Sequence, residues 1–212
     1  MSKKENEIDK KDQKDNLKHS KSIKLGLISQ NSSFINVTEL FNSYFEKSKP
    51  NNYQIKDENR FEFSLSDIPQ LYISINHLKN IEDIHEKNKY NLYNFFLIFV
   101  DIQNISTNSF LEKTIDIIIE ADDNNFNKKC YIYGFYQNND NDKITEEKIT
   151  SILESKGIEY YYNEIRFGDI ESFSKLIECT INDCNTIMIE KYLAQKHSEI
   201  IGDNSNSHCV IY

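Results

Sequence analysis

The sequence predicts an α/β fold of three layers, in which a mainly parallel sheet of six strands is covered by helices on both faces. Two observations predict it. Short apolar runs of strand length alternate along the chain with segments whose apolar residues recur every three or four positions. The run Tyr93–Val100 is almost continuously apolar, which is typical of a strand buried on both faces at the centre of a parallel sheet. Alternating strands and helices favour parallel pairing through right-handed crossovers.

The composition fits one folded domain. The chain has 212 residues, of which 38% are hydrophobic and 12% aromatic, enough for one sizeable core. Its net charge of −9 gives no support for a general nucleic-acid-binding role, which needs a basic surface. The sequence shows neither an apolar leader nor a membrane-length apolar run, so we expect a soluble protein in a reducing compartment, with its four cysteines outside disulfides.

Four segments are expected along the chain. Residues 1–21 form a disordered arm in which lysines alternate with acids, and residues 22–185 form the folded domain. Residues 186–199 are a C-terminal helical extension, and residues 200–212 are a polar tail. A weak electrostatic contact of the arm with DNA or anionic lipid is the alternative to a solvated arm.

The first half of the domain begins with a buried strand at Ser22–Ser29. Thr38 is then expected to cap a helix with an apolar face, which ends in a polar loop at residues 49–52. Two strands follow at Phe61–Leu65 and Leu71–Ile75. Apolar and polar residues alternate in both, which predicts half-exposed or edge strands.

The second half continues the alternation. After a short irregular helix at 79–90 and the apolar strand, the expected elements are a helix at 109–121, a buried strand at 130–135, a helix between Thr145 and Gly157, a Tyr-rich strand at 159–165 and a helix at 169–184. Thr145 is expected to cap its helix, and Gly157 is expected to end it.

This order of elements, with two adjacent strands early in the chain, is that of the small GTPases. A GTPase needs a glycine-rich phosphate loop after its first strand, a Lys for the phosphates and a Ser or Thr for Mg²⁺. Gly26 stands where the first glycine is expected, but Asn31 replaces the second glycine and Ser32 replaces the Lys. Ser33 alone could contact a metal. This loop is therefore predicted to be degenerate and not to bind GTP.

The other nucleotide-binding positions are also degenerate. After the third strand, residues 75–79 lack the Asp-x-x-Gly that binds Mg²⁺ in a GTPase. His77 in this stretch could be a replacement ligand but is interpreted as a loop or surface residue. The Asn/Asp run 139–142 only approximates the guanine-reading motif and is interpreted as a solvated loop. Arg166 and Phe167 occupy the space that a guanine needs. We expect no catalytic residue, no metal and no cofactor.

Two cysteines raise separate possibilities. Cys130 lies within a strand and is expected to be a small buried hydrophobe and not a nucleophile. Cys209 begins the ending Cys-Val-Ile-Tyr, which matches the C-a-a-X pattern for prenylation. Against prenylation, Tyr is an unusual last residue and no polybasic segment precedes Cys209. Cys209 is thus a candidate lipidation site.

Several stretches resemble the centromere protein M family, whose members are inner-kinetochore subunits with a degenerate small-GTPase fold. The similar stretches are Tyr93–Ile102, Ser109–Ile115, Lys128–Gly134, Glu164–Phe173 and Thr186–Leu193. The resemblance implies a structural subunit in the nucleus, at the centromere, that binds no nucleotide. It also implies a helical-repeat partner similar to centromere protein I within a larger assembly, and no direct nucleic-acid contact.

The charged arm and the C-a-a-X ending are departures from that family. They keep open a second hypothesis, a prenylated Ras- or Rab-like pseudo-GTPase that tethers effectors at the cytoplasmic face of a membrane. A third hypothesis is an enzyme with a divergent but active GTPase site, which predicts measurable GTP affinity in the presence of Mg²⁺.

Overall fold

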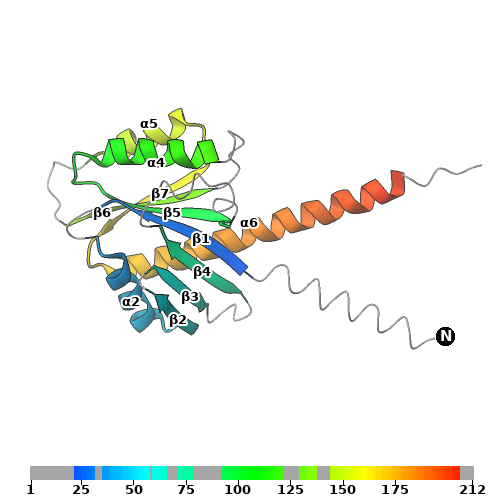
Figure 1. Cartoon of the computed structure of the whole chain (residues 1–212), viewed down its shortest axis with the longest axis horizontal. Coiled ribbons are helices and arrows are strands. Elements are labelled where there is room, and N and C mark those ends of the chain that lie inside the picture. Colours follow the sequence, from blue (N-terminus) through cyan, green and yellow to red (C-terminus); the bar gives the residue numbers. More distant parts are fainter. Residues whose placement is uncertain are drawn as a thin grey trace, which may run out of the picture.

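The computed structural model describes residues 22–31, 35–57, 59–65, 71–78, 92–121, 129–137 and 144–205. Within them, one seven-stranded sheet separates two layers of helices (Figure 1). The predicted α/β fold is therefore confirmed. The predicted count of six strands is wrong, because one further strand is present.

The described strands are β1 (Ser22–Ser29), β2 (Asn51–Asp57), β3 (Arg60–Ser64), β4 (Tyr72–His77), β5 (Phe95–Asp101), β6 (Cys130–Tyr136) and β7 (Tyr160–Arg166). The described helices are α2 (Val37–Ser48), α4 (Thr107–Ala121), α5 (Glu146–Ser155) and α6 (Ile170–Ser205). The helix expected at 79–90 and the arm at 1–21 lie outside the described residues.

The strand order in the sheet is β2-β3-β4-β1-β5-β6-β7. Pairing is parallel from β4 through β7 and antiparallel for the β2–β3 and β3–β4 pairs. The additional strand is β2, which lies at one edge and begins within the expected loop at 49–52. Because β2 takes the edge, β3 and β4 lie inside the sheet, and Phe61 and Phe63 are fully buried. Half-exposed or edge strands were predicted at 61–65 and 71–75; neither is an edge strand, and β3 is buried from Phe61 through Ser64 and thus not half-exposed.

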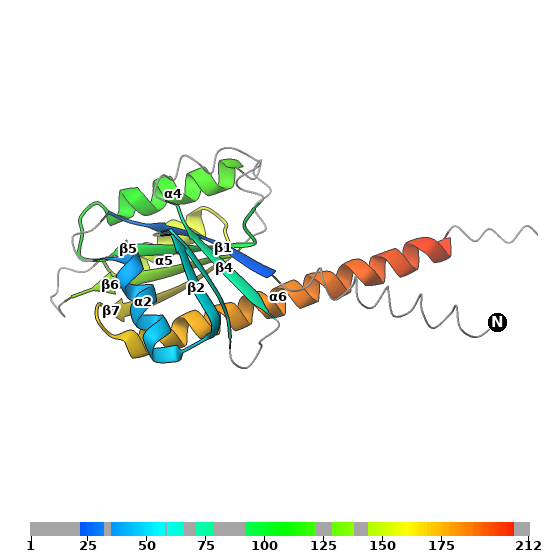
Figure 2. The same ribbon diagram turned by 60° about the horizontal axis from the view of Figure 1, so that its bottom comes forward.

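Each face of the sheet has its own apolar core. The face toward α2 and α6 takes Phe95, Leu97 and Phe99 of β5, whereas the face toward α4 and α5 takes Phe96, Ile98 and Val100. Figure 2 shows α2 and α6 together on one side of the sheet and α4 on the other. Every residue of β5 is buried, which confirms the prediction of a central strand.

Two helix starts differ from those predicted. Asn36, and not Thr38, caps α2, since its side chain accepts a hydrogen bond from the Glu39 backbone N–H. Helix α4 begins at Thr107, two residues earlier than expected. At α5, Thr145 is the N-cap residue as predicted, although its side chain makes no capping hydrogen bond. Gly157 follows α5 with a φ of +65°, as expected for a helix-ending glycine.

Helix α6 is continuous over 36 residues, so no break separates the domain from the extension expected at 186–199. Among its described side chains, which reach Ala194, the last fully buried one is Cys184. From Ile170 to Cys184 the helix rises about 22 Å, which matches the length of about 23 Å of a seven-residue strand. The remainder projects away from the domain (Figure 1) and runs past residue 199 to Ser205. No helix in the described ranges carries an apolar stretch long enough to cross a bilayer.

Candidate functional site

Gly26 lies inside β1 and not in the loop where the first glycine of a phosphate site was expected. It pairs with Phe96 of β5. A Cβ atom added to Gly26 would lie 2.9 Å from Cε1 of the Phe96 ring, closer than real Cβ contacts allow. Packing of an aromatic ring across neighbouring strands therefore explains this glycine. The prediction that Gly26 begins the degenerate loop is wrong, because Gly26 lies within β1.

Gln30 closes the carboxyl end of the central strands. Its side chain, in a residue that is 4% exposed, follows β1 directly. Oε1 accepts hydrogen bonds from the Asp101 backbone N–H and the Thr107 hydroxyl, each at 2.9 Å. Nε2 donates to Oγ of Ser106 at 3.1 Å. One amide thus joins the end of β1 to the end of β5 and to the first turn of α4.

Open α/β folds bind ligands at the carboxyl ends of their strands, next to the strand at which the strand order reverses. In this sheet that strand is β1. Thr107 is fully buried and Asp101 is 6% exposed. The Asp101 carboxylate accepts from the Gln103 backbone N–H at 3.0 Å. In the described part of this edge, hydrogen-bonded side chains fill the space between β1 and α4.

His77 is also part of this edge. It is the last residue of β4 and is half-buried, and its Nε2 lies 2.8 Å from Oγ of Ser29, the last residue of β1. Of the two interpretations, a loop residue or a surface residue, the loop is wrong, because His77 lies in β4. A Ser–His pair can form a nucleophile, but acyl chemistry also needs N–H donors for an oxyanion. The next N–H along the chain, that of Gln30, donates instead to the Phe99 carbonyl at 2.8 Å. The pair therefore joins two strand ends.

The remaining predicted positions are described only in part. Asn31 is exposed, and Ser32, Ser33, residues 139–142 and Cys209 lie outside the described residues. Phe167 is partly buried against the core on the face of the sheet toward α2 and α6. Its backbone N–H donates to the Tyr136 carbonyl at 2.7 Å.

Cys130 is fully buried, as predicted, and burial raises the pKa of its thiol to about 12. Such a thiol is protonated at neutral pH and is a poor nucleophile. Among the described residues, no cluster of His, Cys, Asp and Glu is arranged to hold a metal.

A cavity of about 440 Å³ lies farther along the carboxyl edge, between the start of α4 and the start of α5. Its lining is made of Gln103, Asn104, Ile105, Asn108, Ile144, Thr145 and Lys148. Lys148 is the one cation among the described residues of this lining, and two acids, Glu146 and Glu147, lie in the adjacent first turn of α5. These acids oppose an anionic ligand such as phosphate.

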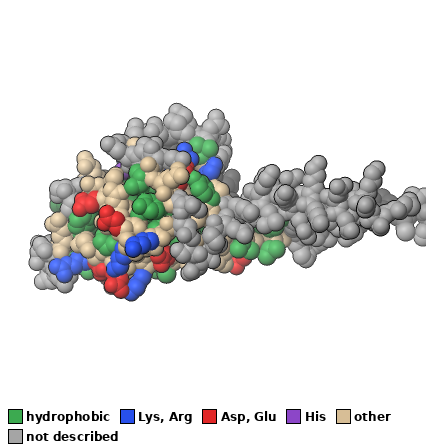
Figure 3. Space-filling view, turned by 90° about the horizontal axis from the view of Figure 1, so that it is seen from below, with side chains coloured by type: hydrophobic (Ala, Val, Ile, Leu, Met, Phe, Trp, Pro, Cys, Tyr) green, Lys and Arg blue, Asp and Glu red, His purple; other side chains and the backbone are tan. Residues whose placement is uncertain are grey.

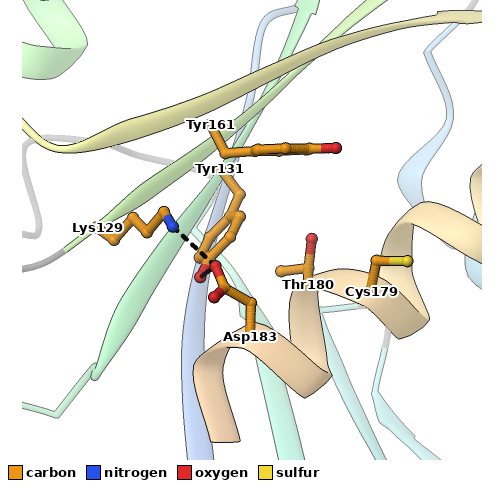
Figure 4. Close-up of a pocket in the computed structure, with 6 residues that line it drawn as sticks. All are labelled: Lys129, Tyr131, Tyr161, Cys179, Thr180 and Asp183. Carbon is orange, nitrogen blue, oxygen red and sulfur yellow. Dashed lines mark hydrogen bonds and ion pairs between the residues drawn. The ribbon is translucent and has the colours of Figure 1, made fainter. Parts of the chain in front are cut away.

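A groove of about 320 Å³ lies on the other side of the sheet, between β6, β7 and α6 (Figure 4). Its lining is made of Lys129, Tyr131, Tyr161, Cys179, Thr180 and Asp183. The rings of Tyr131 and Tyr161 lie with their centroids 6.3 Å apart at an interplanar angle of 51°. They form two aromatic walls, and one turn of α6 forms the third.

Charges gather at one end of this groove. The Lys129 ammonium lies 2.8 Å from Oδ2 of Asp183 and 3.7 Å from Oε1 of Glu159. It also lies 5.5 Å from the centroid of the Tyr131 ring, whose hydroxyl donates to Asp183 at 2.7 Å. Burial lowers the pKa of Lys129, but the hydrogen bond and charge of Asp183 outweigh burial and raise this pKa overall.

Asp183 behaves in the matching way. Burial raises the pKa of its carboxyl, but hydrogen bonds from Lys129 and Tyr131 outweigh burial and lower this pKa overall. Both groups are therefore charged at neutral pH. This site could not be predicted from the sequence, because its residues come from three separate segments, with Lys129 and Asp183 54 positions apart, and form no motif. The only signal was the Tyr-rich strand at 159–165.

No protein-family model matches the chain, and a comparison with curated proteins finds no relative of it. Function has to be inferred from the fold and from these side chains.

Proposed function

We propose that this chain is a non-catalytic, protein-binding scaffold on a small-GTPase-like fold that has lost nucleotide binding. The order of the elements supports the fold part of the proposal. If β2 is left out as an addition at the edge, β3 is the one antiparallel strand among the described strands. β3 and β4 then correspond to the two adjacent strands that small GTPases have early in the chain.

The observation that carries the proposal is the Gln30 side chain. A phosphate loop must leave backbone N–H groups and open space after the first strand. Here the space between β1 and α4 holds an amide with three hydrogen bonds, two of them to buried partners. A nucleotide would have to break these bonds and place its phosphates beside the buried Asp101 side chain, which like charge disfavours.

Exposed apolar groups support a role in protein binding. The projecting half of α6 is the part after Cys184. On it, Ile189 is 46% exposed and Leu193 is 58% exposed. A helix of this kind is marginal on its own in water, so contact with another protein would stabilise it. Figure 3 shows the domain from below, where hydrophobic side chains lie among interspersed acidic and basic ones. Mixed charge with apolar groups fits a protein partner better than nucleic acid.

The resemblance to the centromere protein M family gives the proposal its setting. The similar stretches fall in β5, α4, β6, the turn into α6 and the projecting half of α6. The proposed setting is the inner kinetochore in the nucleus, where the chain would bind a helical-repeat subunit similar to centromere protein I and contribute to chromosome segregation.

A titration with fluorescent GTP and GDP analogues in the presence of Mg²⁺ tests the loss of nucleotide binding. We expect no saturable signal, whereas an active small GTPase run alongside gives one. Saturable binding that competes with unlabelled GTP would refute the pseudo-GTPase part and favour a divergent enzyme.

Imaging of the N-terminally tagged chain through one division tests the setting. We expect discrete nuclear foci coincident with centromeres, unchanged in Cys209→Ser. The C-terminal Cys-Val-Ile-Tyr favours a second candidate function, a prenylated pseudo-GTPase at a membrane. That candidate predicts a membrane signal that becomes diffuse in Cys209→Ser, and such a result would replace the kinetochore proposal.

A further inference from the structure

We propose that the groove between β7 and α6 binds an arginine side chain, carried by an extended segment of a partner protein. This inference rests on the proposed protein-binding function and assigns it a surface and a partner chemistry. Three features of the groove carry it: an accessible aromatic wall, a local excess of carboxylates, and its position beside a free strand edge.

Tyr161 supplies the accessible wall. It is 39% exposed, and within the described residues its hydroxyl makes no hydrogen bond, so the ring is held by its contact with Tyr131. A guanidinium group is planar and weakly hydrated, and it stacks on tyrosine faces. The groove volume of about 320 Å³ is at the small end of ligand pockets, which suits one side chain better than a cofactor.

The charges of the groove call for a cation. Among the described residues, the Lys129 ammonium is shared between the carboxylates of Asp183, which lines the groove, and Glu159, which does not, and these three groups together carry a charge of −1. Lys129 also lies over the Tyr131 ring, so the groove already holds one cation between an aromatic face and a carboxylate. The Tyr161 face offers the same chemistry to a second cation, and the chain's net charge of −9 attracts basic partners.

Hydrogen-bonding capacity favours arginine over a neutral polar group. The hydroxyl of Tyr131 is bonded to Asp183, and that of Thr180 is bonded to Tyr133. What faces the groove is therefore mostly ring, thiol and carboxylate. Asp183 is 42% exposed and Glu159 is 70% exposed, so both can accept from the forked N–H groups of a guanidinium.

The position of the groove accounts for the extended segment. β7 is an edge strand that pairs only with β6 among the described strands. Its outer edge can take a further strand through main-chain hydrogen bonds, and alternate side chains of that strand then point to the face that holds Tyr161. Asp183 of the groove directly precedes the buried Cys184, and Figure 1 shows α6 projecting beyond the domain, so a partner bound in the groove is close to the projecting half of the helix.

The test is an NMR titration of the isotope-labelled full chain with the blocked peptide acetyl-TVRVT-amide. We expect shifts at Tyr131, Tyr161, Thr180 and Asp183. A peptide with citrulline in place of arginine has the same shape without the charge, and we expect it to bind about tenfold more weakly.

Four variants sharpen the test. Tyr161→Ala is expected to lose about tenfold in affinity, whereas Tyr161→Phe keeps the ring and binds unchanged. Lys129→Gln removes the competing cation and is expected to bind the peptide more tightly, the opposite of what an anion site would do. The matched control is Tyr53→Ala, which removes a tyrosine that is 50% exposed on the other edge strand and should leave binding unchanged.

Each contrary result has its own meaning. Equal binding of the citrulline peptide, shifts confined to other surfaces, or full affinity in a folded Tyr161→Ala variant would overturn the arginine groove. Those results do not overturn the scaffold proposal if the nucleotide titration shows no binding. Saturable GTP binding would overturn the scaffold proposal, whereas arginine binding in the groove is decided by the peptide titration alone.

Discussion

Truncation of Gln30 is the sharpest test of how the carboxyl edge is closed. Gln30→Ala leaves the Asp101 backbone N–H without its acceptor in a residue that is 6% exposed, at a cost of about 1–3 kcal/mol. The Thr107 hydroxyl keeps the Asp101 carbonyl as an acceptor and adds little to this cost. The lost methylene adds about 0.8 kcal/mol. We expect the free energy of unfolding to fall by about 2–4 kcal/mol.

Urea unfolding followed by far-ultraviolet circular dichroism measures this change, since the chain has no tryptophan for fluorescence. The matched control is a substitution at Asn31, the exposed neighbour of Gln30, which should cost less than about 0.5 kcal/mol. A loss of less than about 0.5 kcal/mol in Gln30→Ala as well would show that the amide does not hold this edge together.

Gln30→Glu adds a pH test at the same position. Glutamate has the same shape and still accepts from the Asp101 N–H, but it cannot donate to Ser106, and it places a second carboxylate beside that of Asp101. Burial raises the pKa of the new carboxyl in the folded state above its unfolded value of about 4.3. The deficit in stability is therefore small below the unfolded pKa and grows as the pH rises through the folded pKa. A deficit that does not change between about pH 4 and pH 8 would contradict the burial of this side chain.

Three further predictions concern other parts of the domain. Gly26→Ala forces a methyl group against a buried ring and should cost about 1–3 kcal/mol in urea unfolding, and no loss would refute the close contact. Mass mapping after native alkylation should find Cys179, which is exposed, modified well before Cys130, whose pKa is raised to about 12. Asp169→Ala removes a cap that accepts from the Ser172 N–H and hydroxyl, bonds that hold the Asp169 pKa low. This cap contributes about 1 kcal/mol near pH 7, and the contribution disappears as the pH falls through the folded pKa, so equal losses at pH 7 and pH 3 would contradict it.

The buried elements could be predicted from the sequence because burial leaves a continuous pattern. β5 has no polar residue before Asp101, and the inner faces of the helices repeat every three or four positions. β2 could not be predicted in this way. It lies at an edge, pairs on one side only and has an irregular register, so its first residues need not be apolar. Asn51 is a residue type that favours turns, which predicts a loop at this position.

Of the candidate site, only the loss of GTP binding could be predicted from the sequence. The missing Lys and second glycine of a phosphate loop are visible in the sequence, but the Gln30 side chain that fills the space is not, because its partners come from β5 and α4. The continuity of α6 was also hidden. Among the described side chains of α6, none after Cys184 is buried, although the helix itself continues to Ser205.

The path of α6 relates these observations to one another. The helix starts after the carboxyl end of β7, crosses the sheet in about 22 Å and leaves at the amino end of the strands, beside Lys129 and Asp183. The carboxyl edge, where a nucleotide would bind, is closed by Gln30 and joined by Ser29 and His77. The groove and the projecting half of α6 lie at the opposite end. A partner could therefore bind this end without any motion at the closed edge, as the proposed scaffold function requires.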